Sequence, residues 1–166
     1  MVTEQKLHAL ATQLGDSLKA KGMKLAAAES CTGGLLAKII TDLSGCSAWF
    51  EGSIVSYSNA FKHSVLGVSE ATLNEFGAVS RETVQEMCAG VFNNTQADVA
   101  VSISGIAGPD GGSEDKPVGL VWMGWGRRGK SCLTLAFNFA GDREAVRVQA
   151  VEAIMNELLN LINCSE

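Results

Sequence analysis

Short strand-like segments alternate with helical segments along most of this chain, and this alternation restricts the fold more than any other feature. Three segments, 23–28, 53–57 and 97–103, have the length and composition of strands. Strands that are separated by helices pair in parallel, and the helices then cover both faces of the sheet. The sequence therefore predicts an α/β protein, in the form of a three-layer α/β/α sandwich.

The helices are predicted from apolar residues at helical spacing and from residues that favour helix ends. We expect helices over approximately 7–18, 32–43, 58–66, 80–92 and 142–162. Ser58, Ser80 and Asp142 are of the types preferred as N-caps, and Gly22 is a typical residue after a helix. Each boundary is thus supported by a local signal.

Two further strands are predicted over 118–125 and 131–139, joined as a hairpin by residues 126–130. We therefore expect a mostly parallel mixed sheet with an antiparallel strand. Residues 124–131 (GWGRRGKS) also match the P-loop spacing G-x-x-x-x-G-K-[ST]. A P-loop precedes a helix, whereas the residues after 131 alternate as in a strand, so the hairpin is the preferred interpretation.

Composition limits the functional classes. The chain has 166 residues, of which 46% are hydrophobic and 19% charged, and a formal net charge of -5. We expect a single domain over 1–166, since neither a repeat nor a linker interrupts the chain. The acidic balance argues against binding to nucleic acid or to an anionic membrane. Five scattered cysteines without a C-x-x-C pair indicate reduced thiols and a cytoplasmic location.

Hydroxyl side chains follow the three predicted parallel strands, at the edge of the sheet where ligands usually bind. Ser30 follows the first strand, in a turn where backbone N–H groups at a helix start could hold an oxyanion. The alternative is that Ser30 or Thr32 only caps the helix and that Gly33 and Gly34 only allow the turn. Ser30 is therefore a candidate nucleophile if a base lies near it.

Lys62 is the candidate base, because it lies four residues after Ser58 and can lean over the same edge. To act as a base it must be neutral near pH 7, which burial could achieve; the alternative is an exposed helix lysine. Tyr57 could pass a proton or orient Lys62, or could simply pack. Cys31, with His63 as its base, is a weaker candidate nucleophile.

The loop 105–117 is rich in glycine, and successive N–H groups of such loops can hold phosphates. Arg143, at the start of the last helix, could bind a phosphate there or pair with a surface carboxylate. A flexible surface loop is the alternative. Asp110, Glu114 and Asp115 are better interpreted as a solvated acidic rim than as a metal site, and with two histidines in the chain a zinc site with several imidazoles is excluded.

Four ordered motifs together resemble the CinA C-terminal domain family. They are AESCTGG (28–34), VSYSN (55–59) with Lys62, SISGIAGPDGGS (102–113) and GDR (141–143). The resemblance spans essentially the whole chain. It implies a three-layer α/β/α domain, homo-oligomers, and hydrolysis of the carboxamide of nicotinamide mononucleotide (NMN) to nicotinate mononucleotide (NaMN) and ammonia in NAD recycling. Larger CinA proteins carry a further N-terminal domain, whose activity is not implied here.

The resemblance also implies residue roles, namely Ser30 as nucleophile, Lys62 as base and Tyr57 in support. For substrate binding we predict Thr32, Gly33, Gly34, Ser104, Gly105, Gly111, Gly112 and Arg143. No metal or cofactor is expected, because the pyridinium ring of the substrate activates its own carboxamide; the expected partner is a small pyridine nucleotide. The alternative function is a non-catalytic nucleotide-binding or regulatory domain that uses the same pocket.

Overall fold

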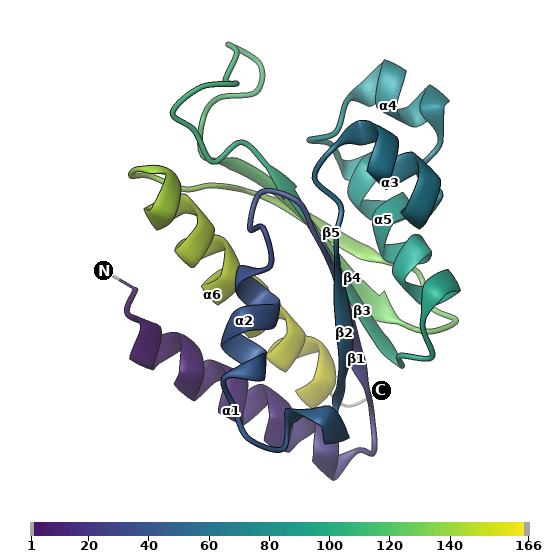
Figure 1. Cartoon of the computed structure of the whole chain (residues 1–166), viewed down its shortest axis with the longest axis vertical. Helices are drawn as coiled ribbons and strands as arrows, with labels where there is room; N and C mark the ends of the chain where they lie inside the picture. Colours follow the sequence, from purple (N-terminus) through teal and green to yellow (C-terminus); the bar gives the residue numbers. More distant parts are fainter. Residues whose placement is uncertain (1, 165–166) are drawn as a thin grey trace.

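A five-stranded sheet lies between two layers of helices in the computed structural model, which describes residues 2–164 (Figure 1). In chain order, the elements are α1 (Glu4–Ala20), β1 (Leu25–Glu29), α2 (Leu35–Thr41), the 3-10 helix η1 (Cys46–Ala48), β2 (Phe50–Val55), α3 (Asn59–Leu66), α4 (Glu70–Phe76), α5 (Arg81–Asn94), β3 (Val99–Gly105), β4 (Leu120–Arg127), β5 (Leu133–Asn138) and α6 (Arg143–Asn163). The predicted α/β class is confirmed.

The strand order in the sheet is β2-β1-β3-β4-β5. β1 pairs in parallel with β2 and with β3, whereas β4 is antiparallel to both β3 and β5. β4 alone therefore runs against the direction of the other described strands, as predicted. The parallel strands β1, β2 and β3 end at one edge of the sheet, where the loops that follow them meet.

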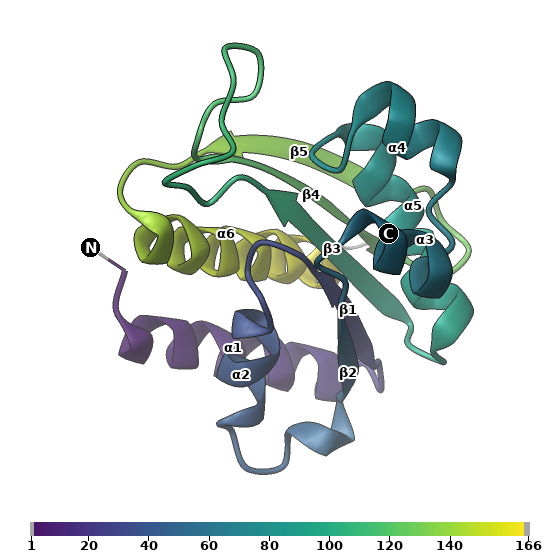
Figure 2. The same ribbon diagram turned by 45° about the horizontal axis from the view of Figure 1, so that its top comes forward.

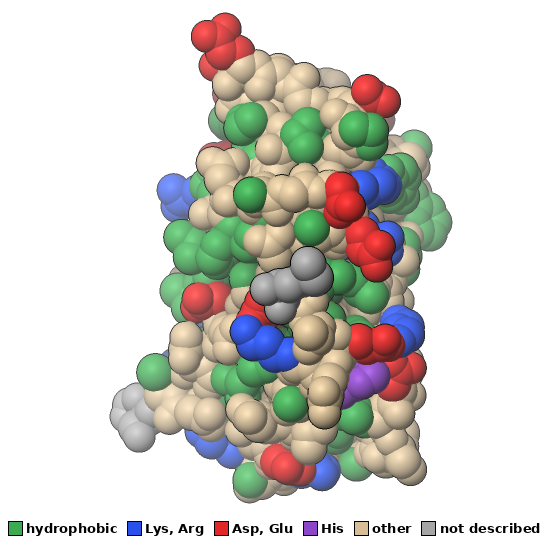
Figure 3. Space-filling view, turned by 90° about the vertical axis from the view of Figure 1, so that its left-hand side faces the viewer, with side chains coloured by type: hydrophobic (Ala, Val, Ile, Leu, Met, Phe, Trp, Pro, Cys, Tyr) green, Lys and Arg blue, Asp and Glu red, His purple; other side chains and the backbone are tan. Residues whose placement is uncertain are grey.

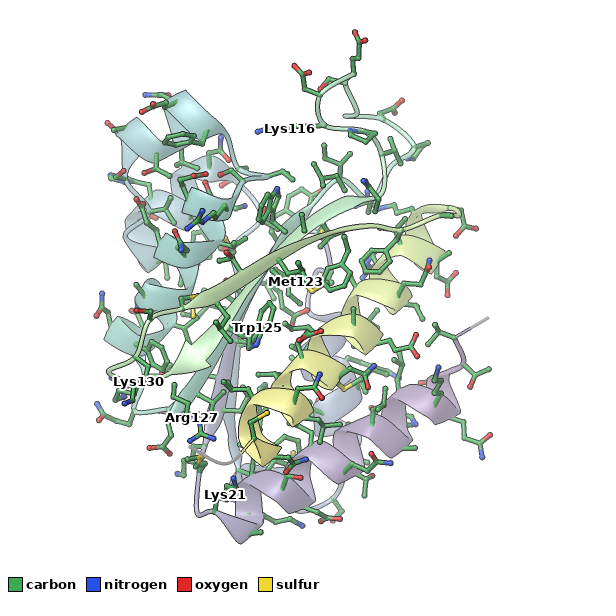
Figure 4. The ribbon with its side chains drawn as sticks, turned by 180° about the vertical axis from the view of Figure 1, so that it is seen from behind. Lys21, Lys116, Met123, Trp125, Arg127 and Lys130 are labelled. Atoms are coloured by element: carbon green, nitrogen blue, oxygen red, sulfur yellow. The ribbon has the colours of Figure 1, made fainter. Side chains whose placement is uncertain are left out.

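The two faces of the sheet are covered by different helices (Figures 1 and 2). α1, α2 and α6 pack on one face, and α3, α4 and α5 lie on the other. Successive residues of β1 alternate between these faces, because Ala27 belongs to the α6 side of the core and Ala28 to the α5 side. Met123 and Trp125 of β4 also lie on the α6 side (Figure 4).

Gly90 of α5 lets the end of α3 approach unusually closely. A Cβ atom at this position would lie 2.1 Å from the carbonyl oxygen of Leu66, the last residue of α3. A larger residue would force the two helices apart. The position of α3, which carries Lys62, therefore depends on the absence of a side chain in α5.

Some boundaries differ from the prediction. α2 begins at Leu35 rather than at 32, because two glycines with positive φ, Gly33 (59°) and Gly34 (93°), extend the turn before it. β2 begins earlier, at Phe50. α4 was not predicted; its buried residue is Thr72, so this seven-residue helix has no apolar stripe to reveal it.

The hairpin interpretation of residues 124–131 is confirmed, since β5 rather than a helix follows them. Within residues 2–164, no helix is both long and apolar enough to cross a membrane. On the face shown in Figure 3, acidic and basic side chains are interspersed with apolar ones rather than gathered into one basic area.

Candidate active site

Ser30 directly follows β1 and is held there by its own main chain. Its N–H donates to Ile103 O of β3 (2.9 Å), and its carbonyl accepts from Gly33 N (3.0 Å). The side chain is 7% exposed. Because Glu29 faces the α2 side of the sheet, alternation along the strand turns Ser30 toward the opposite side, where α3 lies. Strand geometry thus turns the Ser30 hydroxyl toward the α3 side of the sheet.

Lys62 lies on the second turn of α3, which begins after Ser58. The Ser58 hydroxyl accepts from Phe61 N (3.1 Å) and caps this helix. The lysine is 1% exposed, and its Nζ lies 2.9 Å from Ser30 Oγ. The two side chains that the sequence proposed as nucleophile and base therefore meet, although 32 positions separate them.

Two backbone carbonyls fix the direction of the lysine amine. Nζ donates to Ser56 O (2.7 Å) and to Tyr57 O (2.9 Å). A neutral amine has two N–H bonds and one lone pair, so when both N–H bonds point at carbonyls the lone pair points at Ser30. In that state the Ser30 hydroxyl donates to Nζ, which is the arrangement needed to remove its proton.

Burial also makes the neutral form of Lys62 accessible. Desolvation lowers the pKa of this amine from 10.5 to about 8, and the nearby Cys31 thiol acts weakly in the opposite direction. Asp110 also lines the pocket, but within the described residues no carboxylate forms an ion pair with Lys62 that would hold the amine protonated. A general base of this pKa is well matched to reactions near neutral pH.

Glu29 is the feature of this site that the sequence analysis did not use. It is completely buried, and its carboxylate oxygens accept hydrogen bonds from the backbone of α2 and its preceding turn: Gly34 N (3.2 Å), Leu36 N (3.1 Å) and Ala37 N (3.0 Å). The first N–H groups of α2 are therefore occupied. The expectation that this helix start offers them to an oxyanion is wrong. Within the described residues, the N–H groups of this turn that donate to no other residue are those of Cys31 and Thr32.

A pocket of about 230 Å³ opens above the Ser30 and Lys62 side chains. Its walls come from the β1 and β2 ends, the α4–α5 connection, the glycine-rich loop and the start of α6. The lining residues are Ser30, Cys31, Tyr57, Lys62, Ala78, Val79, Ser104, Gly105, Ile106, Ala107, Gly108, Asp110, Gly111 and Arg143. A larger hollow of about 650 Å³ lies between α1 and α6, but none of the predicted site residues lines it.

The rim of the pocket carries Tyr57 and Arg143. The Tyr57 side chain is 63% exposed, and its hydroxyl accepts from Arg143 Nη2 (3.3 Å); Nη1 of the same guanidinium donates to Gly108 O (2.9 Å). Tyr57 thus orients Lys62 through its carbonyl, while its phenol lies beside the arginine. The guanidinium joins the start of α6 to the glycine-rich loop at the pocket mouth.

The predicted substrate-binding residues fall into two groups. Ser104, Gly105, Gly111 and Arg143 line the pocket, and the Ser104 hydroxyl donates to Ala78 O (2.7 Å), which ties the α4–α5 connection to β3. The other predicted residues, Thr32, Gly33, Gly34 and Gly112, are not among the lining residues. For these four, contact with substrate stays a prediction.

Ala78, Val79 and Asp110 line the pocket but were not proposed as binding residues. The first two belong to the segment after α4, the helix that the sequence did not reveal. Lys116 of the glycine-rich loop reaches toward α4 and donates to Phe76 O (Figure 4), so the two segments that flank the pocket are also linked above it.

The alternative with Cys31 as nucleophile finds little support in the geometry. Burial raises the pKa of the Cys31 thiol to about 11, so the thiolate is scarce at neutral pH. His63 Nδ1 lies 2.8 Å from Val68 O, in a contact within its own helix end. The hydroxyl and amine pair is thus the better candidate for nucleophilic chemistry.

Known proteins of similar sequence and structure identify the relatives of this chain. The chain is 58% identical over 149 residues to a nicotinamide-nucleotide amidohydrolase PncC of Enterobacter agglomerans, covering 90% of this chain and 91% of that protein. It is 50% identical over 157 residues to the protein of that name in Escherichia coli K12, covering 95% of each. A crystal structure of a CinA superfamily protein from Klebsiella pneumoniae superposes with a TM-score of 0.91 at 40% identity, covering 94% of this chain and 97% of that one.

The family model of the CinA C-terminal domain matches residues 7–162 of this chain. This range includes Ser30, Lys62 and every residue that lines their pocket. The chain belongs to the CinA C-terminal domain family.

Proposed function

We propose that this protein is an amidohydrolase that converts NMN to NaMN and ammonia, with Ser30 as nucleophile and Lys62 as base. The observation that carries the proposal is the 2.9 Å contact between Lys62 Nζ and Ser30 Oγ inside a pocket. Relatives that bear the name nicotinamide-nucleotide amidohydrolase supply the substrate class. The free thiols fit a cytoplasmic location, and we include that location and a homo-oligomeric state in the proposal.

In the first half of the reaction, Ser30 Oγ attacks the carboxamide carbon and its proton passes to Lys62 Nζ. Negative charge then develops on the carboxamide oxygen, and the N–H groups of Cys31 and Thr32 are the nearest uncommitted donors along the chain. Collapse of this intermediate breaks the C–N bond. Lys62 returns the proton to the departing nitrogen, which leaves as ammonia, and Ser30 remains esterified by the nicotinoyl group.

In the second half, water attacks the ester carbon and gives a proton to Lys62. The C–O bond to Ser30 then breaks and Lys62 returns its proton to the serine oxygen. The carboxylic acid that forms loses the remaining proton of the water to solvent, so NaMN leaves as a carboxylate. One neutral amine thus serves both proton transfers, and histidine has no step to perform. The pyridinium ring withdraws electrons from the carboxamide, so these steps need neither a metal nor a cofactor.

Arg143 is the residue best placed to bind the substrate phosphate. Its guanidinium lies at the pocket mouth and is fixed by Gly108 O and by the Tyr57 hydroxyl. A guanidinium in a fixed orientation can form two parallel hydrogen bonds to phosphate oxygens. A local cation of this kind allows an acidic protein to hold a phosphorylated substrate.

The test is ammonia release from NMN, with the products of a panel of pyridine nucleotides identified by mass spectrometry. Ser30→Ala and Lys62→Ala should each lower kcat by about 10³-fold or more while the circular dichroism spectrum stays that of the wild type. Full activity in either folded variant would reject the dyad. Nucleotide binding without turnover in the wild type would instead favour a regulatory domain.

A further inference from the structure

We propose that Glu29 is a positioning residue, whose buried carboxylate fixes the turn that presents Ser30 to Lys62. This inference rests on the proposed function, because the positioned atom is the nucleophile of that reaction. Glu29 itself has no contact with the pocket and is not among its lining residues. It acts on the reaction only through the main chain.

The contacts of Glu29 close a loop around the nucleophile. Oε2 accepts from Gly34 N and Leu36 N, and Oε1 accepts from Ala37 N (3.0 Å) and from the Ser53 hydroxyl (3.0 Å) of β2. The residue before Ser30 is thereby bonded to the residues at the far end of the same turn. Residues 30–33 therefore form a loop that starts at Glu29 and is closed by the side chain of the same residue.

The main chain of Glu29 strengthens this arrangement on the lysine side. Its carbonyl accepts from Ser56 N (2.8 Å), and Ser56 O in turn accepts from Lys62 Nζ. The same residue therefore connects the turn that carries the nucleophile to the strand end that orients the base. A shift of Glu29 would change both partners of the dyad.

A carboxylate suits this position better than any other side chain. Gly34, at the N-cap of α2, has no side chain to cap the helix, so the first N–H groups need an acceptor from elsewhere. Both oxygens of Glu29 meet donors only, which is the pattern of an ionised carboxylate. Glutamine has nearly the same size, but an NH2 group would replace one of the two oxygens. Its N–H bonds would then face the two donors that this oxygen accepts from.

The charge of Glu29 does not hold the Lys62 amine protonated, because the two side chains lie on opposite sides of the sheet. Glu29 faces α2, whereas Ser30 faces α3, as alternation along β1 requires. The helix N-terminus that surrounds the carboxylate also offsets its charge locally. An acid can therefore stand next to the nucleophile in the sequence without lying next to the base in space.

The experiment compares Glu29→Gln with Glu51→Gln as a matched control. Glu51 is also a strand glutamate that accepts a backbone N–H, from Gln96 (3.0 Å), but it is exposed and lies at the other end of β2. For Glu29→Gln we expect kcat for NMN to fall by roughly 10- to 100-fold, the cost of a misplaced reacting atom, with KM and the midpoint of the pH profile unchanged. Glu51→Gln should retain wild-type kcat.

Ser53→Ala is the milder companion variant, since it removes one donor and leaves the three backbone N–H groups in place. It should lower kcat by a few fold at constant KM. Hydrogen exchange of the peptide that covers 30–37 should be faster in Glu29→Gln, with exchange in β3 unchanged. Hydrogen exchange does not depend on activity. If Glu29→Gln is too unstable for kinetics, the same exchange measurement is made on Ser53→Ala.

Several results would overturn the proposal: wild-type kcat in folded Glu29→Gln, an equal loss in Glu51→Gln, a loss that tracks only the unfolded fraction, or unchanged exchange over 30–37. Failure of the proposed function looks different. In that case the wild type itself releases no ammonia from any nucleotide in the panel, while the exchange result still decides whether Glu29 holds the turn.

Discussion

The two connections that carry the proposed catalytic pair, Ser30 and Lys62, are built in different ways. The β2–α3 connection uses a local cap, in which Ser58 accepts from Phe61 N three residues later. The β1–α2 connection has glycine at the N-cap, and its helix is held by Glu29 from the preceding strand and by a link to Ser53 of β2. Lys62, the proposed base, is thus placed by short-range contacts and burial, and Ser30, the proposed nucleophile, by a buried carboxylate.

Because of this difference, we expect activity to respond to different changes on the two sides of the site. On the lysine side, the chemistry depends on the environment of one amine, so changes in pH and packing should dominate. On the serine side, it depends on the geometry of a turn, so a change of one acceptor should dominate. The measurements below test the lysine side, in order of decreasing effect, against the Glu29 variants described above.

The largest effect should come from pH. The proposed reaction needs neutral Lys62, whose pKa is lowered to about 8 by burial, so kcat/KM for NMN should rise about tenfold per pH unit well below 8 and level off above it. The measurement is initial rates between pH 6 and 9.5. A profile that is flat over this range would show that the amine does not titrate as a base in catalysis.

The next effect is on stability, and its sign follows from the same pKa. The pKa of Lys62 is lower in the folded state (about 8) than its ordinary value of 10.5, so between these values the unfolded chain binds more protons. Stability from this group is therefore fully present above pH 10.5 and is lost as the pH falls through 8. The difference amounts to about 3 kcal/mol.

Lys62→Met removes this titration and keeps a similar volume. The free energy of unfolding of the wild type, minus that of Lys62→Met, should therefore rise between pH 7.5 and 10 in urea titrations. Other groups cancel in the difference because both proteins contain them. A difference that stays constant with pH would mean that the amine is not desolvated.

A smaller effect on stability is expected from a substitution at Gly90, where α3 packs against α5. Gly90→Ala places a Cβ against Leu66 O, so we expect a loss of about 2 kcal/mol in the free energy of unfolding and a several-fold lower kcat as α3 moves Lys62. Ala89→Ser, at the exposed neighbouring position of the same helix, is the control. Equal stabilities of Gly90→Ala and the control would show that α3 is not held at this contact.

The smallest effect should come from the cap of α3. Ser58→Ala removes the acceptor for Phe61 N and should cost about 1 kcal/mol of stability. Because burial still holds Lys62, kcat should stay within about twofold of the wild type. If Ser58→Ala instead lowered kcat as much as Glu29→Gln, the contrast between the two connections would be lost.

The same contrast explains what the sequence revealed. The caps Ser58, Ser80 and Asp142 act within three residues, so a local pattern was enough to predict the starts of α3, α5 and α6. The meeting of Ser30 and Lys62 followed from a rule about parallel strands, which end at one edge. These parts of the fold and of the site depend on short distances in the sequence or on topology.

Other parts depend on partners that no local pattern contains. Glu29 is recognisable only once Ser53 and the backbone of α2 have been placed around it. The pocket wall at Ala78 and Val79 depends on α4, which lacks an apolar stripe. The N–H groups of α2 looked available in the sequence because the residue that occupies them precedes the helix in a strand.

The alternation along β1 sets a strict condition on how this protein can change. Glu29 and Ser30 are neighbours in the chain but serve opposite sides of the sheet. Loss or gain of one residue within β1 would exchange them: the acid would arrive beside the lysine and keep it protonated, and the hydroxyl would be buried under α2. The register of this strand therefore cannot slip by a single position without separating the proposed nucleophile from the proposed base.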